Sequence, residues 1–206
     1  MYYRRVNLLA ATVAYASIMM VIVIAQTARA ASSPQQVVRG AIDSIRGLPA
    51  SDGHPEARRK LLDSIDSALA LDLVAKNALG PQWDKLSKAE RRHFVAVFTE
   101  SLEKLAFPRA ATVLSEVKLT YLGEDKKTTS TEVVKAVIGN DGGGRIPLDF
   151  EMVERGARWQ IADVLVDGTR ISNAVSTRIQ NAVANEGYQK MVEELQRQIS
   201  KPDPVP

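Results

Sequence analysis

The apolar residues of this chain change their spacing twice, and this change constrains the fold more than any other feature. Up to about residue 107 they recur at intervals of three and four residues, which is typical of amphipathic helices. Between residues 117 and 166 they alternate with polar residues, as in strands with one buried face. Helical spacing returns after residue 170. Helices, then strands, then helices predict an α+β domain.

Six stretches of the chain carry the helical spacing. These predicted helices cover residues 34–46, 55–67, 69–79, 87 to about 107, 170–184 and 188–199. Ser87 and Glu90 form the sequence pattern of a capping box, in which the serine accepts from the third residue of the helix. Gly80 and Pro81 form a normal helix stop, and Pro108 is expected to end the helix that begins at Ser87.

Four stretches carry the alternating pattern and are separated by turn residues. These predicted strands lie around residues 117–121, 131–138, 146–152 and 159–165. Short connections imply an antiparallel meander. We expect a curved four-stranded sheet covered by about six helices, with Phe94, Phe98 and Leu102 facing the sheet. A curved sheet under helices can enclose an apolar cavity, which is a natural ligand pocket.

The N-terminal segment has the pattern of a secretory signal peptide. Arg4 and Arg5 precede an uncharged apolar run over residues 8–25, and Ala28 and Ala30 provide small residues for cleavage. We therefore predict a signal peptide over residues 1–30, a single domain over 31–200 in the periplasm, and a disordered tail over 201–206. A retained membrane anchor is the alternative, because the apolar run approaches the length that spans a bilayer.

Composition narrows the classes of function. The chain has 206 residues and a formal charge of +3, but the predicted signal peptide contributes three arginines and no acid, so the remainder is neutral. A neutral domain has no overall field that would attract nucleic acid. Cysteine is absent, and His54 and His93 are too few and too isolated for a metal site. No metal or cofactor is expected.

Asp163 is the one candidate for acid–base catalysis, because it alternates with apolar residues and could point inward. A small cone-shaped hydrolase or isomerase would use it as a buried base. Acid–base chemistry needs partners, and no inward histidine, tyrosine or second acid accompanies Asp163. We therefore expect Asp163 to accept hydrogen bonds and the chain to be no enzyme. A membrane-anchored interaction module also stays open as an alternative.

Two motifs resemble those of a known family. Leu79-Gly80-Pro81-Gln82-Trp83 is followed by Leu86-Ser87, and about 75 residues later Trp159-Gln160-Ile161-Ala162-Asp163-Val164 leads to Gly168. This order resembles the MlaC or toluene-tolerance family of periplasmic lipid carriers, and its branch associated with hopanoid biosynthesis. The resemblance covers residues 35–200. It implies an MlaC-like fold, related to NTF2-like and cystatin-like folds, with a deep apolar cavity for lipid tails.

The resemblance also implies a function and partners. A monomeric carrier of phospholipid or hopanoid-type lipid would shuttle between an inner-membrane ABC transporter complex and an outer-membrane lipoprotein complex. The expected lipid-binding residues are Trp83, Phe94, Phe98, Leu102, Leu119, Tyr121, Val134, Val137, Leu148, Phe150, Met152, Trp159 and Ile161. The chain departs from the family pattern at Arg170 and at Ala174-Val175-Ser176, which favours a divergent or hopanoid-associated member.

Overall fold

The computed structural model describes residues 32–139 and 144–201. The predicted signal peptide and residues 202–206 of the predicted tail lie outside the described residues. The described residues from Ser32 onward belong to one compact unit. No helix of the described ranges combines the length and the apolar character that crossing a membrane requires.

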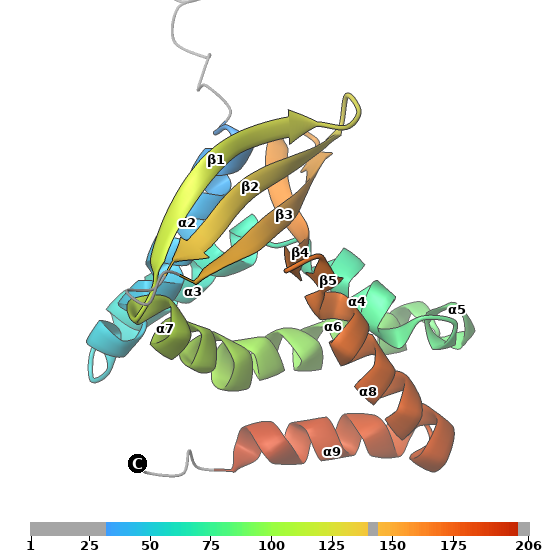
Figure 1. The fold of residues 1–206 in the computed structure, drawn as a ribbon. Coiled ribbons are helices and arrows are strands. Elements are labelled where there is room, and N and C mark those ends of the chain that lie inside the picture. The colour runs from blue at the N-terminus through green and yellow to red at the C-terminus, as the bar shows by residue number, and fades with distance from the viewer. Residues whose placement is uncertain (1–31, 140–143, 202–206) are drawn as a thin grey trace, which may run out of the picture. The chain divides into compact units, whose positions relative to one another are not determined.

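Five antiparallel strands form one sheet in the order of the sequence (Figure 1). The strands are β1 (Lys118–Lys126), β2 (Thr131–Gly139), β3 (Arg145–Arg155), β4 (Arg158–Val166) and β5 (Thr169–Arg170). The first four strands confirm the predicted meander. The prediction of a four-stranded sheet is wrong, because β5 adds a fifth strand. The two-residue strand β5 forms because Asp167 and Gly168 both adopt positive φ and turn the chain tightly back on β4.

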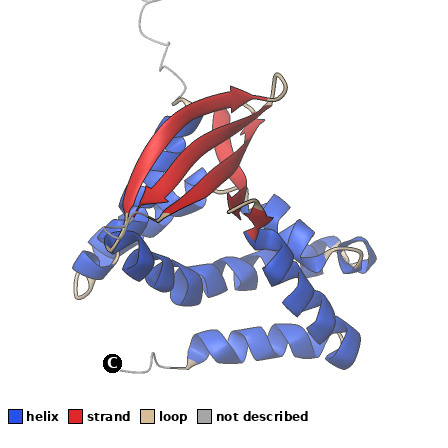
Figure 2. Cartoon of the chain, viewed as in Figure 1, coloured by secondary structure: helices blue, strands red, loops and turns tan. Residues whose placement is uncertain are grey.

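Helices precede and follow the sheet (Figure 2). Before it lie α2 (Pro34–Gly47), α3 (Pro55–Ala68), α4 (Leu71–Leu79), α5 (Gln82–Lys85), α6 (Lys88–Ser101) and α7 (Phe107–Ser115). After it lie α8 (Ile171–Glu186) and α9 (Tyr188–Ser200). The predicted capping box is confirmed, since the Glu90 amide donates to the Ser87 hydroxyl at 3.2 Å and the Ser87 amide donates to the Glu90 carboxylate at 2.8 Å.

The prediction that the helix from Ser87 ends at Pro108 is wrong. A π-helical turn over Leu102–Ala106 follows α6, and α7 continues the helical path to Ser115. Pro108 lies in the first turn of α7. Proline is tolerated at this position because the first amides of a helix have no intrahelical acceptor to lose.

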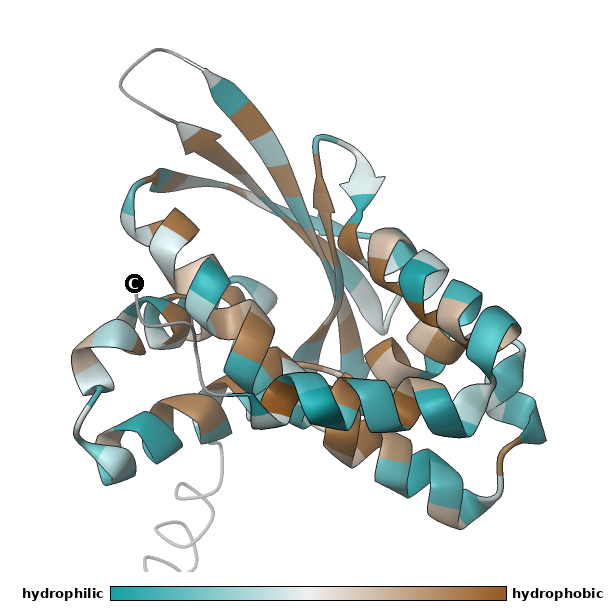
Figure 3. Cartoon of the chain, turned by 90° about the horizontal axis from the view of Figure 1, so that it is seen from below, coloured by the Kyte–Doolittle hydropathy of each residue, from teal (hydrophilic) through white to brown (hydrophobic). Residues whose placement is uncertain are grey.

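The buried side chains divide into two main cores. The sheet core joins α2 and the ends of α3 and α7 to one face of the sheet, with Val38, Val134 and Phe150 among its members. The helical core joins α4, α6, α8 and α9, and includes Phe94 and Phe98. Figure 3 shows the apolar stripes of these helices and the alternation along the strands.

The expectation that Phe94, Phe98 and Leu102 face the sheet is therefore wrong. All three pack in the helical core, and the aromatic ring of Phe94 also lies near that of Tyr188 on α9. The predicted helices do not all cover the sheet, because four of them bury their apolar faces against one another. α2 provides the main cover of the sheet.

Candidate functional site

The sheet carries more apolar surface on its α2-facing side than the helices cover. Leu119 pairs with Ile138, and Ile138 pairs with Ile146, so these side chains form one row across β1, β2 and β3. Val166 on β4 belongs to the next row and pairs with Leu148. We call Leu119, Ile138, Ile146 and Val166 the apolar strip. Its members are half-buried, except Ile146, whose exposed fraction of 45% makes it a surface residue.

Burial decreases along the strands toward the strip. Val134 and Phe150, one row further along, are 0% and 3% exposed and belong to the sheet core. The same face therefore begins as ordinary core and ends as accessible apolar surface. Adjacent apolar side chains that stay partly accessible to solvent mark an interaction or ligand site more often than single exposed residues do.

Helices α7 and α8 add further accessible apolar side chains. Val113 on α7 is 57% exposed and Ile171 at the start of α8 is 49% exposed. No residue of α8 is fully buried, and Val175 and Ile179 pack only partly against the helical core. Helix α8 thus has an apolar side that its neighbours cover incompletely.

The predicted lipid contacts lie in different parts of the domain. Those on the α2-facing side of the sheet are Leu119, Tyr121, Val134, Leu148, Phe150, Met152, Trp159 and Ile161. Those in the helical core are Trp83, Phe94, Phe98 and Leu102. Val137 lies on the opposite face, because Val134, Ala136 and Ile138 alternate toward the sheet core. The structure therefore brings together eight of these residues and separates five from them.

The grooves found on the described surface differ from the expected enclosed apolar cavity. One groove, of about 650 Å³, opens to solvent between α4 and the start of α8, and is bordered by Lys76, Asp84 and Asn173. The predicted lipid contacts line neither this groove nor the three smaller ones described. The enclosed cavity stays a prediction.

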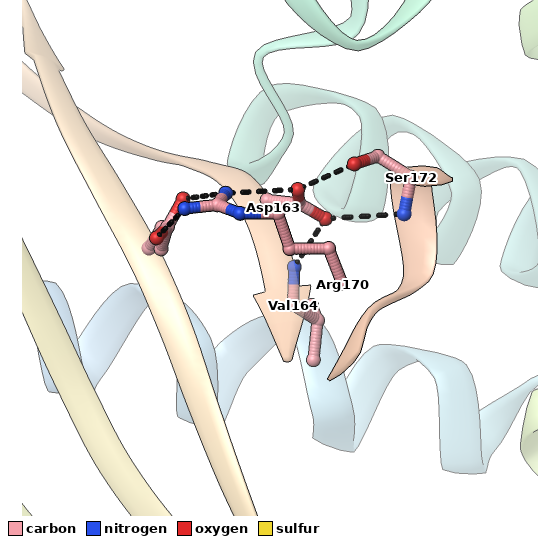
Figure 4. A network of polar contacts seen from close by, with 5 residues as sticks. Asp163, Val164, Arg170 and Ser172 are labelled. Atoms are coloured by element: carbon pink, nitrogen blue, oxygen red, sulfur yellow. Dashed lines mark hydrogen bonds and ion pairs between the residues drawn. The ribbon is translucent and has the colours of Figure 1, made fainter. Parts of the chain in front are cut away.

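Asp163 is the centre of a polar network beside this groove (Figure 4). Its carboxylate accepts from the Val164 amide at 2.8 Å, from the Ser172 hydroxyl at 2.6 Å and from the Ser172 amide at 3.3 Å. The Arg170 guanidinium donates to it at 3.2 Å and also binds Glu151 through two nitrogens. The expected role of Asp163 as a hydrogen-bond acceptor is confirmed.

A β-bulge explains where Asp163 points. The register between β3 and β4 shifts between Glu151 and Met152, which pairs Glu151 with Asp163 and Met152 with Ile161. The extra residue, Ala162, turns Asp163 away from the sheet core. Two carboxylates directly opposite on neighbouring strands repel each other, so the Arg170 cation between them stabilises the pair. The Asp163 carboxylate also accepts from the first turn of α8, as a capping residue does.

Trp83 lies against the helical core. Its ring packs partly against the helical core, and the Arg91 guanidinium lies 5.5 Å from the ring centroid. Arg91 Nε also donates to the Trp83 carbonyl at 2.9 Å. These contacts fix the short helix α5 against α6.

An ion pair joins α4 to the sheet. Arg155, at the end of β3, binds both carboxylate oxygens of Asp72, one of them at 2.9 Å. The Arg155 hydrogen bond holds the pKa of Asp72 below its usual value. In residues 32–139 and 144–201, no group of three potential ligands could hold a metal ion.

Sequence reasoning missed Ile138, Ile146 and Val166 as site residues. Ile138 and Ile146 continue the period-2 pattern of their strands, so the pattern itself places them on the apolar face. Val166 is out of phase with Ile161 and reaches that face only because of the bulge in β4. The signal that could have singled them out is their position at strand ends, beyond the reach of a single covering helix. The Glu151–Arg170 pair had no local signal, because it depends on strand register and on the bulge.

The comparisons agree with this architecture. The model of the family described as MlaC protein matches residues 35–197. A phospholipid-binding protein from Ralstonia solanacearum, solved in complex with a phospholipid, has a similar fold with a TM-score of 0.64. The two chains are 17% identical over 81% of this chain and 96% of that one. The comparison with curated proteins gave no match. Since the family model spans most of the sequence, this chain belongs to the MlaC family.

Proposed function

We propose that this protein binds phospholipid and covers the acyl chains with the apolar strip and the accessible apolar side chains of α7 and α8. The observation that carries the proposal is the row formed by Leu119, Ile138 and Ile146, which continues the apolar face of the sheet past its helical cover. Membership of the MlaC family supports it. So does the similar fold of a protein solved with a phospholipid.

The energetics favour a lipid over a small polar ligand. Burying one CH₂ group contributes about 0.8 kcal/mol to the free energy of binding. Two acyl chains would therefore bind favourably even to an apolar surface that covers them only in part. The same burial opposes release. A carrier therefore needs a second state in which the tails lose part of their cover.

The proposed role is a non-enzymatic carrier in the periplasm. The predicted signal peptide supports export, and the family supports a shuttle between an inner-membrane ABC transporter complex and an outer-membrane lipoprotein complex. The departures at Arg170 and Ser176 have structural roles, because Arg170 binds two carboxylates and Ser176 donates to backbone carbonyls of α4. We therefore propose phospholipid as the first ligand to test, with hopanoid-type lipid as the alternative that the same extraction would detect.

Native mass spectrometry of gently purified protein, with lipid extraction, tests the proposal. We expect a lipid adduct in the parent protein and a phospholipid in the organic extract. Ile146→Asp places a charge on the apolar strip and should abolish most of the adduct. Leu122→Asp is the matched control, because Leu122 is exposed at the β1 bulge outside the strip. A bare parent protein, or equal adducts in both variants, would contradict the proposed site.

A further inference from the structure

A small third cluster connects the two main cores. Leu48, Ile65 and Phe107 are buried in it, and Ile65 and Phe107 bring α3 against the start of α7. Leu69 also packs against the sheet core, and Leu102 also packs against the helical core. This junction cluster is therefore a contact through which the two cores are held together.

The backbone at the junction cluster is irregular. The π-helical turn over Leu102–Ala106 interrupts the α-helical hydrogen bonding between α6 and α7. Such turns are rare and occur frequently at functional sites, where they allow a helix to adjust. Leu102, the first residue of the turn, packs against both the helical core and the junction cluster. A change in the π turn would therefore change how these two clusters pack together.

Two carboxyl groups meet at the same point. Asp66, on the last turn of α3, lies within hydrogen-bonding reach of Glu103 in the π turn. One carboxylate oxygen of Asp66, Oδ1, is buried and has no hydrogen-bond partner among the described residues. Two partly buried carboxyl groups this close together are most stable when one of them carries a proton that the other accepts.

Two further charged groups that act on Asp66 lie on its own helix. Asp63 adds repulsion and Arg59 adds attraction, but these two side chains are exposed and bind each other at 3.0 Å. Burial, followed by the charge and hydrogen bond of Glu103, raises the pKa of Asp66 from 3.8 to about 6. The Asp66 carboxyl thus changes its charge within the range of pH that proteins meet in solution.

We propose that the junction cluster is a hinge between the sheet core and the helical core, and that a proton shared by Asp66 and Glu103 holds it closed. The inference refines the function proposed above and rests on it. When the shared proton leaves, two carboxylates repel each other across the contact between α3 and the π turn. The helical core then moves away from the sheet, and the tails on the apolar strip lose cover.

The size of the effect follows from the pKa of Asp66. A displacement from 3.8 to about 6 corresponds to a bias of about a hundredfold between closed and open states if opening frees both carboxyl groups. The pair is partly accessible to water, which reduces the expected bias to about tenfold. We therefore expect lipid release to be about tenfold faster at pH 7.5 than at pH 5.

A distance measurement tests the hinge without any lipid. The chain has no cysteine, so Thr120→Cys on β1 and Lys190→Cys on α9 would carry the only two spin labels. We expect the label–label distance distribution of the full mature chain to differ between pH 5 and pH 7.5. Asp66→Asn replaces the shared proton by a permanent amide donor, and should give the pH 5 distribution at both pH values. Identical distributions in the parent at both pH values would overturn the proposal.

Two further variants make the test specific. Glu103→Gln places the amide donor on the π turn, where it can donate to the Asp66 carboxylate. This variant should also remove the pH response of the label–label distance. Asp63→Asn makes the same charge change one turn earlier on α3 and should retain it. Loss of the response in Asp63→Asn, or its survival in both amide variants, would overturn the carboxyl pair as the cause. If lipid fails to bind while the distances still respond to pH, the proposed function fails and the hinge stands.

Discussion

Replacing Asp163 by alanine should destabilise the domain more than any other single change of an acidic residue in β4 or α8. The substitution removes the acceptor of the Ser172 amide, which is worth about 1 kcal/mol for a helix cap. It also removes the charge-assisted bond from the Ser172 hydroxyl at 2.6 Å, worth about 1.5–3 kcal/mol. The ion pair with the half-exposed Arg170, which keeps its bonds to Glu151, adds less than about 1 kcal/mol. We expect a loss of about 3 kcal/mol in the free energy of unfolding.

Urea unfolding followed by circular dichroism measures this loss directly. Asp163→Asn keeps one oxygen acceptor but loses the charge, so it should lose about 1–2 kcal/mol. Glu193→Ala, at an exposed position of α9, is the control and should stay within about 0.5 kcal/mol of the parent. A loss below 1 kcal/mol for Asp163→Ala would refute the argument that this carboxylate organises β4, β5 and the start of α8.

Three further predictions concern other parts of the domain. The pKa of Asp66 is raised to about 6, so the folded state keeps a proton that the unfolded state loses above pH 3.8. The free energy of unfolding should therefore fall as pH rises from 4 to 6 and then level off. Asp66→Asn should remove this fall and be about 1 kcal/mol more stable than the parent in urea unfolding at pH 7. The pKa of Asp72 is lowered, so the ion pair with Arg155 should stabilise the fold above pH 4 and lose this effect as pH falls further. Asp72→Asn should lower the free energy of unfolding by less than about 1 kcal/mol at pH 7 and leave it unchanged in acid. Gly80 has φ +56°, and an added Cβ would lie 2.7 Å from the side-chain amide nitrogen of Gln180, which would have to move away from its bond to Ser176. Gly80→Ala should therefore lower the melting temperature slightly more than Gly53→Ala, where φ is also positive but the space is open.

The sequence predicted the elements well because periodicity reports local geometry. The alternation over residues 146–152 follows from the pleat of β3, and the stripe from Phe94 follows from the pitch of α6. Strand β5 has only two residues, which is too short to produce a period. Periodicity also shows that a face is buried without showing what buries it, so Phe94 was assigned to the sheet although α9 covers it.

The candidate site was harder to predict because it depends on how far the helices extend over the apolar face of the sheet. Val134 and Val137 are equally apolar, but their separation of three residues places them on opposite faces of β2. Ile146 and Phe150 lie on the same face of β3, but Ile146 is 45% exposed and Phe150 only 3%. The contacts of Asp163 depend on the bulge at Ala162, which reverses the phase of the alternation in β4. Such features follow from tertiary packing and leave no pattern in the local sequence.

The central claim is that acyl chains lie on the α2-facing side of the sheet at the apolar strip. A phospholipid that carries a photoactivatable diazirine on one acyl chain would test it most directly, with the cross-linked residues identified by mass spectrometry. We expect cross-links to Leu119, Ile138, Ile146 and Val166, and their loss in Ile146→Asp but not in Leu122→Asp. Cross-links confined to the groove between α6 and α9, or to the polar groove beside Asp163, would contradict it.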